Sequence, residues 1–121
     1  MDFRPTEEQE LMVQAIEDAM NRENLETYFQ DCDKNHEHPK KWWDILDELG
    51  LFSMFLPEEA GGDGEGAVTM FLVMEALGRC GGPIYLFWDH VKADALLENG
   101  TKEQIDKFMP LFFEGKPAFA Q

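Results

Sequence analysis

The turn at residues 56–62, Leu-Pro-Glu-Glu-Ala-Gly-Gly, restricts what this chain can fold into more than any other stretch. Pro57 fixes its own φ and has no amide hydrogen to donate, while Gly61 and Gly62 permit backbone angles that other residues avoid. The segment before the turn, residues 51–56, is almost wholly apolar. We therefore expect a buried, extended or irregular link that ends in a specific turn and so orients the helices on its two sides.

Apolar residues recur at helical spacing through most of the chain, and strand-like alternation is not convincing. The 121 residues are enough for one domain with a real core. The pattern predicts the all-α class, a compact bundle of about six helices with irregular Gly- and Pro-rich connections, as a single domain over residues 1–121. The expected helices cover residues 6–22, 24–32, 39–49, 67–78, 83–100 and a last segment from Thr101 on.

Local signals mark the ends of several of these helices. Thr6 with Gln9, and Thr101 with Gln104, have the residue types and spacing of a capping box. Asn24 is expected to cap the second helix with its side chain. These signals predict three well-defined helix starts.

Other expectations concern helix ends and contacts. Gly50 should terminate the third helix, and Pro110 should bend or shorten the last one. Glu75 and Arg79, at i and i+4, have the favourable order for an ion pair within one helix. The last residues, 118–121, are the one place where a strand might begin.

The charge balance excludes several classes of partner. The chain has 25 acidic residues against 10 Lys and Arg, a formal charge of −15. Such a surface repels phosphates, so neither nucleic acid nor an anionic membrane is an expected partner. The two cysteines, Cys32 and Cys80, make no disulfide framework, no signal peptide is evident, and no apolar run reaches membrane-spanning length. A cytoplasmic location is the simplest interpretation.

Patterns that resemble metal and phosphate sites are incomplete. Asp31, Asp33 and Asn35 open like a calcium loop, but the pattern then needs Gly at its sixth position and Glu at its twelfth, where this chain has His36 and Trp42. Cys32, His36 and His38 have loosely zinc-like spacing without a fourth ligand nearby. The glycines at positions 62, 64 and 66 lack the dinucleotide order, and Asp63 and Glu65 would repel phosphate. We therefore expect no metal site.

Catalytic groups are equally sparse. Ser53 has no nucleophile-elbow motif around it. Glu58 and Glu59 are adjacent carboxylates in a turn, which are usually solvent-facing rather than a general acid/base pair. The feature with most binding potential is the apolar set on one side of the fifth helix, Ile84, Phe87, Trp88 and Val91. Plain core packing and a ligand-binding wall are both consistent with it.

Several of these motifs together resemble the N-terminal helical domain of the acyl-CoA dehydrogenases. They are Thr-Glu-Glu-Gln at 6–9, Pro-Glu-Glu-Ala-Gly-Gly at 57–62, Glu-Ala-Leu-Gly-Arg at 75–79 and Gly-Thr-Lys-Glu-Gln at 100–104. Tyr28-Phe29 and Cys32-Asp33 are similar to the crotonobetainyl-CoA reductase-like branch. The resemblance runs from residue 1 to about residue 119. Ala60 departs from it, because the family usually has an aromatic residue or His there.

The resemblance implies a function for the whole enzyme. The family's enzymes take the α-proton and the β-hydride from an acyl-CoA thioester, and FAD receives the hydride. The fifth helix lines the acyl pocket, so Ile84, Phe87, Trp88 and Val91 are the expected substrate-binding residues, with His90 at the pocket edge. Their aromatic bulk favours short or branched acyl groups.

The resemblance also implies what this chain lacks. The central β-domain and the second helical bundle, which bind FAD and carry the catalytic Glu, are absent from these 121 residues. We therefore expect no catalytic or cofactor-binding residue here and no activity from this segment alone. The parent enzyme is expected to be a homo-oligomer that passes electrons to a transfer partner. The alternative is a free-standing helical interaction module without catalysis, which a native stop after Gln121 would favour.

Overall fold

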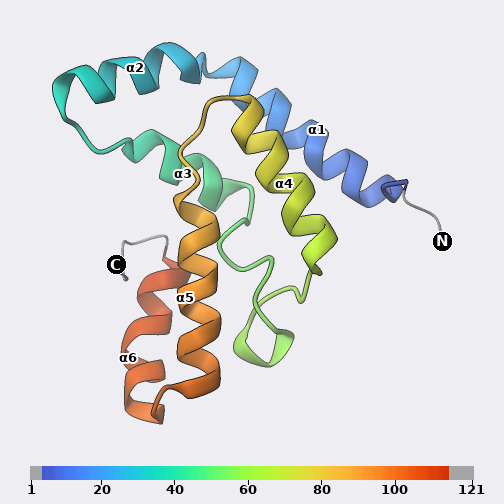
Figure 1. Ribbon diagram of the computed structural model, residues 1–121, viewed down its shortest axis with the longest axis vertical. Coiled ribbons are helices and arrows are strands. Elements are labelled where there is room, and N and C mark those ends of the chain that lie inside the picture. Colours follow the sequence, from blue (N-terminus) through green and yellow to red (C-terminus); the bar gives the residue numbers. More distant parts are fainter. Residues whose placement is uncertain (1–3, 115–121) are drawn as a thin grey trace.

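The computed structural model describes residues 4–114, which form six α-helices and one short 3-10 helix, η1, with no strand in that range (Figure 1). The all-α prediction is therefore confirmed. The possible strand at 118–121 lies outside the described residues. The elements are α1 (Glu7–Arg22), α2 (Leu25–Asn35), α3 (Lys40–Glu48), η1 (Glu58–Ala60), α4 (Ala67–Arg79), α5 (Tyr85–Asn99) and α6 (Lys102–Phe113).

Helices α1 and α4 lie side by side and run in the same direction (Figure 1). Near their starts, the Gln9 side-chain amide donates to the Thr69 hydroxyl at 3.0 Å. Near their ends, Arg79 forms a 3.2 Å ion pair with Glu17. The predicted Glu75–Arg79 pair is wrong, because the guanidinium reaches across to the neighbouring helix instead.

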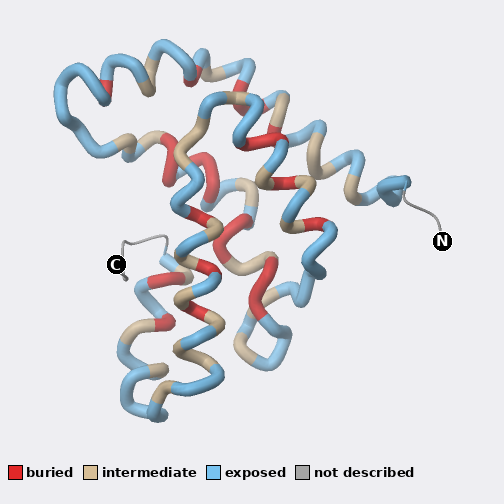
Figure 2. The backbone as a smooth tube through the Cα atoms, in the orientation of Figure 1, coloured by how far each residue is buried: buried red, intermediate tan, exposed pale blue. Residues whose placement is uncertain are grey.

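The apolar link between α3 and η1 is buried, as its composition predicts. Its residues Leu51, Phe52, Phe55 and Leu56 are all at most 7% exposed, and they form an irregular series of turns (Figure 2). They join the core residues contributed by the helices. In space, the link therefore lies between the α1–α4 pair and the α5–α6 hairpin (Figure 1).

The turn at 56–62 closes through both of its glycines. Gly61 has φ +90°, and the amide of Gly62 donates to the Pro57 carbonyl at 3.1 Å. A Cβ atom at Gly62 would lie 2.2 Å from the Leu56 carbonyl oxygen. One glycine thus supplies a left-handed backbone, and the other permits a close approach between two chain segments.

The predicted capping boxes of α1 and α6 are both present, with Thr6 paired to Gln9 and Thr101 to Gln104. Asn24 is the N-cap residue of α2, as predicted, but it is left-handed (φ 47°) and the expected side-chain capping hydrogen bond is absent.

Two helices end differently from what their sequences suggest, and one ends as predicted. Helix α2 extends beyond Cys32 to Asn35, because His36 adopts a left-handed conformation and closes it there. Helix α6 continues past Pro110 to Phe113, although this proline removes one amide hydrogen bond and crowds the carbonyl one turn before it. Gly50 follows the end of α3 with φ +70°, as predicted. No helix in residues 4–114 is long and apolar enough to cross a membrane.

Candidate functional site: the outer face of α5

Helix α5 begins at a tightly packed junction with α3. The indole Nε1–H of Trp42 donates to the Pro83 carbonyl at 3.3 Å. A Cβ at Gly82 would come within 2.4 Å of the Trp42 ring, so only glycine lets the chain pass this close. Trp42 is itself fully buried. The large buried side chain of Trp42 on α3 therefore fixes the position of the chain just before α5 begins.

The outer face of α5 carries apolar side chains that the described residues cover only in part. Ile84 and Tyr85 are 52% exposed, Trp88 is 46% exposed and Val91 is 44% exposed. Core packing is therefore the wrong interpretation for Ile84, Trp88 and Val91. The inward residues are Leu86, His90 and Ala93.

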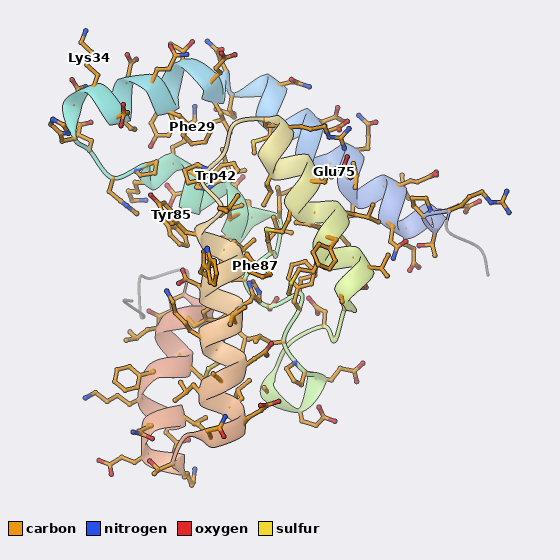
Figure 3. The ribbon with its side chains drawn as sticks, viewed as in Figure 1. Phe29, Lys34, Trp42, Glu75, Tyr85 and Phe87 are labelled. Atoms are coloured by element: carbon orange, nitrogen blue, oxygen red, sulfur yellow. The ribbon has the colours of Figure 1, made fainter. Side chains whose placement is uncertain are left out.

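Phe87 lies at the border between the two faces. It is half-buried, and its ring meets that of Trp88 edge to face, with centroids 5.3 Å apart. Three of the four predicted pocket residues thus lie in α5 and Ile84 is its N-cap residue, and Ile84, Trp88 and Val91 share the outer side. Sequence reasoning missed Tyr85, which projects near the start of α5 (Figure 3). Its position next to Ile84 and three residues before Trp88 was the available signal.

His90 is on the opposite, inner face, so its predicted place with the pocket residues is wrong. It is fully buried between the rings of Phe55 and Phe112, whose centroids lie 5.1 and 5.2 Å away. Its Nδ1 lies 2.8 Å from the Leu86 carbonyl, which only accepts, so Nδ1 must carry the proton. Within residues 4–114, Nε2 has no hydrogen bond of good geometry, although the Phe52 backbone lies near.

Burial lowers the pKa of His90 below its usual value of 6.5. The Leu86 carbonyl and the negative charges of Asp94 and Asp89 oppose this shift without overcoming it. The ring is accordingly a neutral packing element, and it joins α5 to both α6 and the 51–56 link.

Polar groups elsewhere do not assemble into a reactive centre within the described range. Glu58 and Glu59 are both exposed on η1. Cys32 is buried on α2, while His36 and His38 are exposed. Among residues 4–114, no three His, Cys, Asp or Glu side chains converge as metal ligands would. The outer face of α5 is suited to binding an apolar group rather than to bond making or breaking.

These features define a helical domain that presents a row of half-exposed apolar side chains on one face of α5. The family model of the acyl-CoA dehydrogenase N-terminal domain matches residues 6–116, nearly the whole chain. The chain therefore belongs to the acyl-CoA dehydrogenase family and corresponds to its N-terminal domain. No solved structure matches it.

Proposed function

We propose that this domain is part of an FAD-dependent acyl-CoA dehydrogenase or reductase of the crotonobetainyl-CoA reductase-like branch. In this proposal the outer face of α5 forms one wall of the acyl pocket. The observation that carries it is the row of exposed apolar side chains Ile84, Trp88 and Val91 on a domain with a formal charge of −15. Water-exposed apolar rows on one helix mark a surface that something else covers.

An apolar wall stabilises an acyl chain by removing its methylene groups from water. Each buried methylene contributes about 0.8 kcal/mol, or roughly a fourfold gain in affinity. The edge-to-face contact between Phe87 and Trp88 holds both rings in a fixed arrangement. Two aromatic side chains of this bulk shorten the space along the wall, which favours short or branched acyl groups.

FAD, bound to the other domains of the parent enzyme, supplies the acceptor or donor for the β-hydride. The residues described here do not fit the cofactor. The glycine-rich loop at 61–66 carries Asp63 and Glu65, which are exposed and would repel a pyrophosphate. This domain is therefore assigned substrate positioning and packing against its neighbours, and no step of the hydride transfer.

The test uses the native full-length protein, titrated without oxygen with a series of acyl-CoA thioesters while the flavin absorbance is followed. We expect flavin bleaching by a short or branched acyl-CoA. Trp88→Ala should shift the preference toward longer chains, by about fourfold for each methylene that newly finds a buried position. Phe71→Ala is the matched control, because Phe71 is 69% exposed and belongs to α4 rather than α5.

Two results would refute parts of the proposal. Equal effects of Trp88→Ala and Phe71→Ala would show that the outer face of α5 is not a pocket wall. A colourless native protein with the mass of these 121 residues would refute the enzyme itself. The free-standing interaction module would then be the better account of the exposed apolar face.

A further inference from the structure

A second apolar surface lies on another side of α5. It is a groove of about 460 Å³ between η1, α5 and α6. Its lining is apolar except for one carboxylate, and consists of Pro57, Glu59, Ala60, Leu97, Ile105 and Met109. None of these residues belongs to the outer face of α5, so the groove is separate from the proposed acyl wall.

Two of the residues that line the groove are small or adaptable. Ala60 contributes a single methyl group on the η1 side and is itself only half-buried. Met109 on the α6 side is buried and has a flexible, polarizable side chain that adjusts to different neighbours. A side chain of moderate size therefore finds an apolar surface on each side of this space.

Negative charge lies at one side of the groove. Glu59 lines it, and Asp94 is three residues before Leu97, on a neighbouring part of the α5 surface. Burial raises the pKa of Asp94, His90 opposes this shift, and the charge of Glu98 raises the pKa further. Neither Glu59 nor Asp94 has an ion-pair partner among residues 4–114, whereas the exposed Lys102 is already paired with Asp106 at 2.7 Å.

We propose that this groove docks a basic amphipathic helix of a partner protein, with an apolar side chain in the groove and Lys or Arg side chains at Glu59 and Asp94. An apolar groove that receives anchors from one helix face is a common recognition mode. Unpaired carboxylates beside it select a cationic partner and repel others. A second copy of this chain brings the same formal charge of −15, which opposes self-docking here.

The test measures binding of a fluorescent synthetic helical peptide to the native full-length protein by fluorescence anisotropy. The peptide carries Leu at helical spacing along one face and Lys on the flanking positions, and a second peptide has Glu in place of each Lys. We expect the Lys peptide to bind and the Glu peptide not to bind. Ala60→Trp, which fills the groove, should weaken binding about tenfold, while Ala60→Ser should retain it.

Charge reversal separates docking from general attraction to an acidic protein. Glu59→Lys and Glu26→Lys change the net charge equally, but Glu26 is exposed on α2, far along the chain from the groove. We expect about tenfold weaker binding for Glu59→Lys and at most twofold for Glu26→Lys. Equal losses would overturn the proposal by showing unspecific attraction, and a full-length protein that does not bind the Lys peptide would overturn it as well. Flavin bleaching by acyl-CoA does not depend on this groove, so this proposal and the acyl-wall proposal fail independently.

Discussion

Replacing Gly62 by alanine should destabilise the fold strongly, although only one methyl group is added. That methyl group would lie 2.2 Å from the Leu56 carbonyl oxygen and 2.5 Å from its carbon, whereas real Cβ atoms essentially never come within 3.0 Å of another heavy atom. The backbone would therefore have to open by about 0.8 Å, the difference between 3.0 and 2.2 Å. Both atoms belong to the main chain of a buried residue, which no rotamer change can move away.

The loss of stability comes from the hydrogen bonds that this opening of the backbone breaks. The Leu56 carbonyl accepts from Gly64 at 2.9 Å, and the Gly62 amide donates to Pro57 at 3.1 Å. Losing both hydrogen bonds costs roughly 1–3 kcal/mol. Overpacking against the buried link adds about 1–3 kcal/mol. We expect Gly62→Ala to lower the free energy of unfolding by about 3 kcal/mol, a large part of the total for a domain of this size.

Urea unfolding followed by tryptophan fluorescence and far-UV circular dichroism measures this change. Gly61→Ala should cost less, about 1–2 kcal/mol, because it meets only Phe113 at 3.8 Å and suffers from its φ of +90° alone. Gly78→Ala is the opposite control, since Gly78 is inside α4 with nothing within 4 Å, and alanine there should stabilise by about 0.5–1 kcal/mol. A loss below about 0.5 kcal/mol for Gly62→Ala would refute the steric reasoning.

Three further predictions concern single side chains. His90 has a lowered pKa in the fold, so the unfolded chain binds the extra proton, and the free energy of unfolding should fall as the pH drops below about 6.5, by up to about 1.4 kcal/mol per pH unit. His90→Leu should remove this slope between about pH 5 and 7. An unchanged slope in pH-dependent urea titrations would assign the pH dependence to other groups. Thr101→Ala removes the hydroxyl that accepts from the Gln104 amide at 3.3 Å and should cost about 1 kcal/mol in the same unfolding assay, whereas no change would show that this cap contributes nothing. Arg79→Met should change thermal stability by less than about 1 kcal/mol, because its pair with Glu17 is half-exposed, and a larger loss would show a buried role for the guanidinium.

Local signals predicted the fold where a single residue type has a unique backbone role. Gly50 and Gly61 both have positive φ and end a helical turn, as expected from glycine alone. Asn24 and His36 also adopt left-handed conformations, although their side chains do not require it. There the tertiary path of the chain decides, although Asn and His are among the non-glycine residue types that adopt this conformation most often.

Contacts between different helices could not be predicted from the spacing of residues along the sequence. Glu75 and Arg79 have an ideal spacing for an ion pair, yet Arg79 reaches Glu17 on α1. An exposed pair within one helix gains only a few tenths of a kcal/mol, so a neighbouring helix with a carboxylate at the right height competes easily. Only the parallel packing of α1 and α4 places Glu17 at that height.

Helix α5 shows why the inward side of a helix cannot always be read from its sequence. Apolar periodicity indicates the core face only when the opposite face is polar. In α5 the inner face contains Leu86, His90 and Ala93, while the outer face has Ile84 and Trp88, which are at least as apolar. The sequence therefore placed Ile84, Trp88 and Val91 on one side but could not tell that His90 is enclosed. A helix that is apolar on both faces is typical of the interior of a larger assembly. From α5 alone, without any resemblance, we therefore expect a further surface to cover Trp88 in the native protein.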